Sequence, residues 1–206
     1  MPKYETIQIL GIDLAGQEEN PTGICILNNQ KVILKSLYSN AEIFEEIKRN
    51  NPHLIVIDAP LSLPKGRCCL EKECECAVGG HIRQAEREIR SYGRVLPLTF
   101  KGMKMLTLRG IDLVSGLRET YNVLEAHPRT TQKILGFQNP EKELKEFFKW
   151  ETSPSIHELD ATLAALTGFL YQKNCHLSLG TSEEGIIIIP KNRDCLKKLS
   201  ELTQFV

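Results

Sequence analysis

The chain has 206 residues, a length typical of one domain or of one domain with a sizeable insertion. Its residues are 41% hydrophobic and 25% charged, which excludes wholesale disorder and fibrous architectures. The 26 basic residues balance the 26 acidic ones. The net charge therefore gives no argument for a protein that binds nucleic acid or membranes through its overall charge, although it allows a locally basic face.

Neither export nor membrane contact is expected. Residues 1–14 hold only a short apolar stretch before Asp13, without the apolar core or cleavage site of a signal peptide. The longest aliphatic run, residues 186–189, is far shorter than the ~20 residues that a membrane-spanning helix needs. Four of the seven cysteines lie between residues 68 and 76, a cluster that favours metal binding or reduced thiols over a disulfide framework. We expect a cytoplasmic protein.

The first third of the chain has the pattern of strands followed by a helix and a further strand. Strands are expected over residues 6–14, 22–27 and 31–37, the last two joined by a hairpin turn. Asn40 is expected to cap a helix over residues 41–49. The continuous aliphatic run at 54–57 is typical of a central strand covered on both faces, and it ends at Asp58.

Residues 61–120 are less regular, and we expect them to form an insertion. The insertion holds the cysteine cluster and helical patterns at 81–91 and 103–117. After it, the pattern predicts a strand over 122–126, helices over 141–150 and 155–172, a strand over 185–189 and a final helix over 193–202. This order of elements indicates an α/β domain with a mixed sheet.

Four acidic residues occupy positions where such sheets form sites. Asp13 and Asp58 end strands, Glu125 lies near the end of another, and Asp160 lies in the first turns of a long helix. Because sites in open α/β sheets form beyond the carboxyl ends of strands, these acids are expected to converge. Clustered carboxylates repel one another unless a cation compensates, and Mg²⁺ or Mn²⁺ suits oxygen ligands. Two such ions support phosphodiester hydrolysis. A lone aspartate at a strand end is more often a turn former or a helix cap than a ligand, so the hypothesis depends on the combination.

The start of the helix over 155–172 contains a capping motif and a pair of residues that could take part in catalysis. Ser155 and Glu158 have the spacing of a capping box, which gives Glu158 a structural role. His157 and Asp160 are three residues apart and therefore share a helix face. That pair alone is a weak signal, because an acid in the first turns of a helix also suits the helix dipole.

Several motifs together resemble an uncharacterised family of predicted nucleases with an RNase H-like fold, common in archaea and bacteria. The matching segments extend from residue 11 to about residue 165, most of the chain. They are GIDLAG at 11–16, VIDAPLSLP at 56–64, RQAEREIR at 83–90, GMKMLTLRG at 102–110, EAHPR at 125–129 and HELDA at 157–161. Singly, only the segments at 102–110 and 125–129 are distinctive.

The resemblance implies a single RNase H-like domain over residues 1–206. Its core would be a mixed five-stranded sheet flanked by helices, with a helical, Cys-rich insertion after the fourth strand. Asp13 on the first strand, Asp58 on the fourth and Asp160 on the C-terminal helix would be ligands of Mg²⁺ or Mn²⁺. His157 would be a ligand or a general base, because the segment at 157–161 is similar to the RuvC-type variant of the site. Glu125 matches a motif of the family whose role is not established, so ligand and structural roles stay open.

Contacts with a nucleic-acid substrate have a candidate surface. Residues 83–118 hold eight basic and three acidic residues, a local charge of +5. Four arginines, at 83, 87, 90 and 94, have the spacing of one helix face, which either binds phosphates or is simply solvated. The residues expected to contact a phosphate are Arg87, Lys104, Arg109 and Arg129.

The cysteine cluster suggests a second, structural metal site. Besides Cys68, the segment offers four soft ligands for Zn²⁺, namely Cys69, Cys74, Cys76 and His81. The spacing is not that of paired Cys-x-x-Cys knuckles, so reduced thiols without a metal remain the alternative.

We therefore expect a metal-dependent nuclease that hydrolyses phosphodiester bonds of nucleic acid, DNA or RNA. One alternative is a non-catalytic module of the same fold that binds nucleic acid or a nucleotide. Another is an ATP-using enzyme with an actin-like fold, which shares the strand order. The length argues against this last class, because it needs two such domains.

Overall fold

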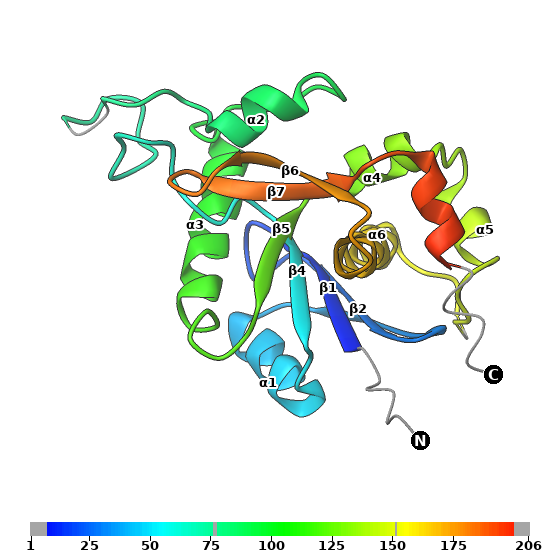
Figure 1. Ribbon diagram of the computed structural model, residues 1–206. Helices are drawn as coiled ribbons and strands as arrows, with labels where there is room; N and C mark the ends of the chain where they lie inside the picture. The colour runs from blue at the N-terminus through cyan, green and yellow to red at the C-terminus, as the bar shows by residue number, and fades with distance from the viewer. Residues whose placement is uncertain (1–7, 76–77, 151, 200–206) are drawn as a thin grey trace.

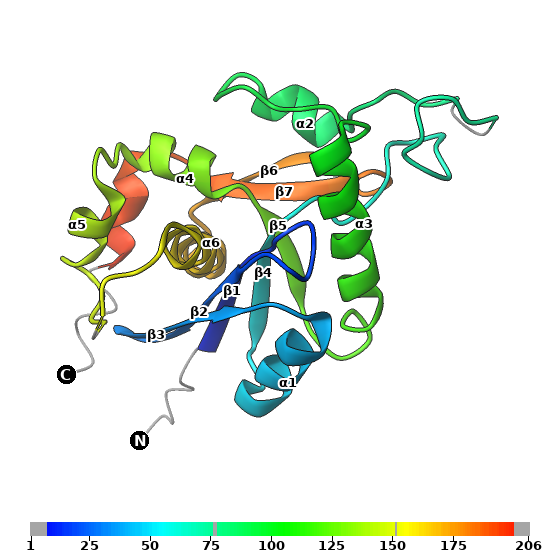
Figure 2. The same ribbon diagram turned by 180° about the vertical axis from the view of Figure 1, so that it is seen from behind.

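The computed structural model describes residues 8–75, 78–150 and 152–199. A mixed seven-stranded sheet forms its centre, and helices cover both faces of the sheet (Figures 1 and 2). The strand order is β3-β2-β1-β4-β5-β7-β6. Among the described helices, none combines the length and the apolar character that a membrane span requires.

The sheet has an antiparallel half and a parallel centre, so the expected mixed sheet is confirmed. β1 pairs antiparallel with β2, β2 antiparallel with β3, and β1, β4 and β5 run parallel. β7 is parallel to β5, and β6 is antiparallel to β7. The strands are β1 (Gln8–Asp13), β2 (Thr22–Asn28), β3 (Lys31–Leu37), β4 (Leu54–Asp58), β5 (Val123–Ala126), β6 (His176–Thr181) and β7 (Gly185–Pro190).

The expectation of five strands is wrong, because the hairpin of β6 and β7 extends the sheet beyond β5. The aliphatic run of β7 buries Ile187 and Ile189 beneath α2 (Gln84–Ile89). β6 had no clear sequence signal, since only Leu177 and Leu179 are apolar on its inner side and both are half-buried. Such a short alternation becomes a strand here through its pairing with β7.

The helices separate into two layers. On one face of the sheet lie α4 (Pro128–Leu135), α5 (Pro140–Leu144), α6 (Ile156–Gln172) and the 3₁₀ helix η1 (Arg193–Leu199). On the other lie α1 (Asn40–Asn50) and α3 (Lys101–Ser115). The segment between β4 and β5 carries α2 and α3, and its cysteine-rich part projects away from the sheet (Figure 1).

Several helix boundaries differ from expectation for local reasons. Ser39, not Asn40, caps α1, because its hydroxyl and the carboxylate of Glu42 form a reciprocal capping box. The helix expected over 141–150 ends at Leu144, since Lys149 instead pairs with the edge strand β3 through backbone hydrogen bonds. α4 was not expected, although Pro128 at its first position is a known start signal. The final helix is a short 3₁₀ turn, and residues 200–202 lie outside the described part of the chain.

A disulfide joins Cys175, between α6 and β6, to Cys195 of η1. Neither cysteine carried a clear sequence signal, so this bond was not predicted. Cys195 is fully buried, so the bond ties the C-terminal turn to the core that covers α6.

Two glycines in the sheet allow the backbone of α6 to contact the backbone of β1 and β2 directly. A Cβ atom at Gly11 of β1 would overlap the carbonyl oxygen of Ala161, and one at Gly23 of β2 would overlap that of His157. On α6, Ala161 and Ala165 follow His157 at helical spacing and are fully buried. The first turn of α6 is consequently held against the end of β1.

This packing predicts opposite effects for two glycine substitutions. Gly23→Ala should lower the free energy of unfolding by about 1–3 kcal/mol or more, because the new methyl group collides with backbone that cannot move aside. Gly102→Ala, in α3 with open space around the position, should raise it by about 0.5 kcal/mol. Urea denaturation of both variants measures the difference. Equal effects would contradict the close approach of α6.

Candidate active site

Two carboxylates lie side by side where parallel strands end. Asp13 is the last residue of β1, Asp58 is the last residue of β4, and the two are register partners. Because side chains alternate along a strand, Asp13 lies on the same face as Gly11, which touches α6. Asp58 likewise shares the face of Val56, which belongs to the core beneath α6. The two acids therefore face the helix that carries the third.

α6 brings a histidine and a further carboxylate to this position. His157 Nδ1 lies 2.7 Å from Asp13 Oδ2. Because an ionised carboxylate only accepts hydrogen bonds, Nδ1 donates this bond, and a neutral form of the ring would keep its lone pair on Nε2. The ring is 44% exposed, so solvent and ligands reach it. Asp160 lies one turn further along the same helix face.

The three aspartates share an unbalanced negative charge. Burial raises the pKa of Asp58 well above its usual range, and the charges of Asp13 and Asp160 raise it further. Burial, together with the charge of Asp13, raises the pKa of Asp160 to about 6. Burial also raises the pKa of Asp13, and the hydrogen bond from His157 offsets part of this effect. Such mutual repulsion is the condition that a bound cation relieves.

Arg129 is the cation that faces the cluster. It lies in the first turn of α4, is exposed, and lowers the pKa of Asp13, Asp58 and Asp160 through its charge. Within the described residues its guanidinium makes no hydrogen bond. A buried hydrogen bond of 2.8 Å between the hydroxyls of Thr131 and Thr167 fixes α4 on α6.

Glu125 is engaged elsewhere. Its register partner is Ile57, which belongs to the core on the α3 side, so its side chain lies on the opposite face from Asp13 and Asp58. Both carboxylate oxygens accept hydrogen bonds from Arg83, and one also accepts from the Leu61 N–H at 3.0 Å. Its partner Arg83 is fully buried. These contacts favour the structural role over the ligand role.

Three of the residues expected to bind phosphate are held by protein acceptors. Arg109 is buried, and its guanidinium fastens the loop after β1 to the start of α1. Its acceptors are the carbonyl oxygens of Ala15, Gln17 and Tyr38 and the side chain of Asn40. Lys104 Nζ lies 2.9 Å from Glu71, and Arg87 lies 3.3 Å from Glu184. The expected row of four arginines is broken, because α2 is short and Arg83 is buried.

Three cysteines lie close together, but they are not the four ligands expected from the sequence. The sulfur atoms of Cys68, Cys69 and Cys74 all lie within 4.8 Å of one another. Cys68 is disulfide-bonded, and a hydrogen bond with Cys74 raises the pKa of the Cys69 thiol. Cys76 lies outside the described residues. His81 is not part of the set, and its Nδ1 lies 3.1 Å from the Thr99 hydroxyl.

The potential ligand atoms of the three aspartates are farther apart than the sulfur atoms of the three cysteines. In the described ranges, the three cysteines are the one group whose potential ligand atoms are all within 4.8 Å of one another. The oxygen donors of Asp13, Asp58 and Asp160 nevertheless fit Mg²⁺ or Mn²⁺ chemically. Mg²⁺ is usually bound through one or two carboxylates, with waters and substrate phosphate completing its shell, so it does not need a compact all-protein cage.

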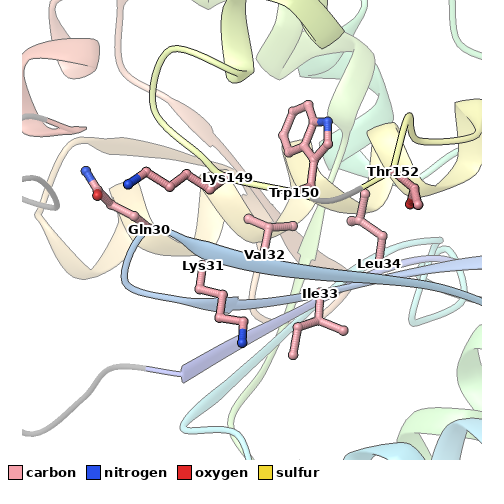
Figure 3. Close-up of a pocket in the computed structure, with 8 residues that line it drawn as sticks. All are labelled: Gln30, Lys31, Val32, Ile33, Leu34, Lys149, Trp150 and Thr152. Atoms are coloured by element: carbon pink, nitrogen blue, oxygen red, sulfur yellow. The ribbon is translucent and has the colours of Figure 1, made fainter.

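A cavity of about 420 Å³ adjoins the carboxylates and is lined by Asp58, Arg94 and Arg129 among others. A larger cavity of about 670 Å³ lies along the edge strand β3 (Figure 3). There Val32 and Leu34 point toward Trp150, while Lys31 and Ile33 point to the other side of the strand. The described residues that line that cavity include no carboxylate, whereas Asp58 lines the smaller one.

The raised pKa of Asp160 predicts a pH-dependent effect of its removal. The pKa is higher in the folded protein than in the unfolded chain, so ionisation of Asp160 costs stability as the pH rises through about 4 to 6. Asp160→Asn should therefore raise the free energy of unfolding at pH 8, and the gain should vanish near pH 3.5. Urea denaturation across this pH range measures the difference in the free energy of unfolding.

Asp194→Asn, at an exposed acid paired with Lys197, is the control and should give no gain in the free energy of unfolding at pH 8. A gain for Asp160→Asn that is independent of pH would contradict the charge repulsion.

Comparisons with known proteins give one structural likeness. No family model matches the chain. No curated protein matches it either. A solved structure, T. thermophilus RuvC in complex with Holliday junction substrate, is similar to it with a TM-score of 0.49 and 13% sequence identity. The match covers 82% of this chain and 96% of the RuvC chain.

Proposed function

We propose that this protein is a metal-dependent phosphodiesterase that acts on nucleic acid. The observation that carries the proposal is the convergence of Asp13, Asp58 and Asp160 from β1, β4 and α6, with raised pKa values that the charge of Arg129 offsets only in part. Carboxylates that destabilise the fold are typical of sites kept for chemistry. The motif resemblance to predicted nucleases supports the same conclusion.

Asp13, Asp58 and Asp160 would hold Mg²⁺ or Mn²⁺. When bound, such an ion supplies stabilisation of phosphoryl oxygens and a lower pKa for water. The choice of a hard ion follows from the donor set, which consists of carboxylate oxygens.

His157 and Arg129 have roles that follow from their hydrogen bonds and charge. Asp13 keeps the His157 proton on Nδ1, so Nε2 is free to accept a proton from the attacking water. The water oxygen then forms a bond to phosphorus as the bond from phosphorus to the leaving oxygen breaks. Arg129, without a hydrogen-bond partner among the described residues, is available to bind a phosphate oxygen.

Metal binding can be measured without knowing the substrate. Titration of Mn²⁺ into the wild-type protein by calorimetry should give saturable binding that Asp13→Asn removes. Asp194→Asn is the matched control and should bind as the wild type does. The Asp13→Asn protein should melt at the same or a higher temperature, because one of three repelling charges is gone. If Asp13→Asn unfolds the protein, the acid has a structural role and the metal site loses its main support.

Cleavage is tested on labelled single-stranded, duplex and branched DNA and RNA with Mg²⁺ or Mn²⁺. Asp58→Asn should lower kcat/KM by at least about 100-fold. His157→Ala should lower kcat by about 100-fold or more, as expected for loss of a general base. Mn²⁺-dependent cleavage that persists in Asp58→Asn would assign the activity to another site or to a contaminant. Metal binding without cleavage of any substrate would favour the non-catalytic alternative.

A further inference from the structure

Apolar side chains make up much of the lining of the cavity beside Asp58. The cavity lies between the end of β4, α3 and the segment that follows α2. Its volume of about 420 Å³ is within the range of sites that enclose small ligands. The larger apolar side chains of the lining are those of Pro60, Val95, Leu96, Met103, Leu106 and Ile187.

Charged side chains also line the same cavity. Asp58 belongs to the carboxylate cluster, and Arg94 and Arg129 are exposed cations that also line the cavity. A ligand that fills this space therefore places an anionic group beside the arginines and an apolar group among the aliphatic side chains. A nucleotide has this division, because its phosphate is anionic and the faces of its base stack on apolar groups.

Two further acids line the cavity, Glu86 and Glu125, and both accept hydrogen bonds from Arg83, which is fully buried. The single guanidinium offsets part of their negative charge. Of the described residues that line the cavity, the exposed cations are Arg94 and Arg129, and these are the groups suited to bind an anion.

His127 adds a polar group suited to a base edge. Its Nδ1 accepts a hydrogen bond from the Thr130 N–H at 3.3 Å, so in the neutral ring the proton is on Nε2. Burial and the charge of Arg129 lower the pKa of His127, which keeps the ring neutral near pH 7. The nitrogen and oxygen atoms on the edges of bases accept hydrogen bonds from such donors.

We propose that this cavity receives the base of an unstacked nucleotide whose phosphate lies at Asp58 and Arg129. The proposal rests on the proposed function, which places the phosphate at the carboxylates. A base within a duplex cannot enter the cavity, so the substrate class is single-stranded or locally unpaired nucleic acid.

Binding of small probes tests the cavity without any cleavage. The four nucleoside 5′-monophosphates and ribose 5-phosphate are titrated by calorimetry into the wild-type protein with Mg²⁺. At least one monophosphate should bind about tenfold or more tightly than ribose 5-phosphate, since stacking of one base contributes this much. Arg129→Gln should weaken both kinds of probe by a similar factor.

Substitutions that fill the cavity localise the base. Met103→Trp, on α3, and Leu96→Trp, on the segment after α2, fill the cavity from two different elements and should remove the advantage of the monophosphate while leaving ribose 5-phosphate unchanged. Leu108→Trp is the control, because Leu108 is also on α3, is 48% exposed and does not line the cavity. Thermal denaturation verifies the folding of each variant. If Met103→Trp does not fold, Leu96→Trp decides whether the base occupies the cavity, because Leu96 is already 39% exposed and a larger side chain fits there.

The outcomes separate this proposal from the nuclease proposal. Equal binding of monophosphates and ribose 5-phosphate, or a base preference that survives both filling variants, would overturn the base subsite even if cleavage is observed. Absence of binding by every probe would also overturn it. A base preference that the filling variants remove would support the subsite, whether or not the protein cleaves nucleic acid.

Discussion

The close packing of α6 on the first two strands positions the candidate site. Because Gly11 and Gly23 have no side chains, the backbone of α6 packs directly on β1 and β2, and a Cβ atom at either position would overlap it. His157 and Asp160 occupy the end of this contact, where β1 and β4 finish in Asp13 and Asp58. A longer separation would remove the 2.7 Å contact between His157 and Asp13. The geometry of the site therefore depends on residues without functional groups.

Hydrogen bonding divides the acids around the end of β4 into two groups. Glu125 and Glu86 are buried and both accept hydrogen bonds from Arg83, and the Leu61 N–H fixes Glu125 in place. Burial raises the pKa of Glu125, and the contacts with Arg83 offset part of this effect. Asp13, Asp58 and Asp160 also carry raised pKa values, but within the described ranges no buried arginine contacts them. The second group is the candidate for chemistry, because its oxygens are not committed to a buried guanidinium.

Strand alternation and capping were readable from the sequence, because they depend on near neighbours. The runs that end in Asp13 and Asp58, and the capping box of α6, predicted where the acids lie. The arginines were harder. Helical spacing placed Arg83 on a face that binds phosphates or is solvated, and the motif resemblance placed Arg109 at a phosphate. Partners more than 40 residues away bury both arginines. The β6–β7 hairpin and the disulfide of Cys175 depend on tertiary pairing in the same way. Short-range patterns carry no information on such partners.

Diffraction from crystals grown with Mn²⁺, collected at its absorption edge, tests the central claim most directly. The account predicts an anomalous peak bound by oxygen atoms of Asp13, Asp58 and Asp160, and no peak at that position in crystals of Asp13→Asn. Ordered Mn²⁺ elsewhere on the chain, with the three aspartates unbound at a concentration that saturates the calorimetric titration, would contradict it. The carboxylates would then be a structural cluster, and the nuclease proposal would lose its basis.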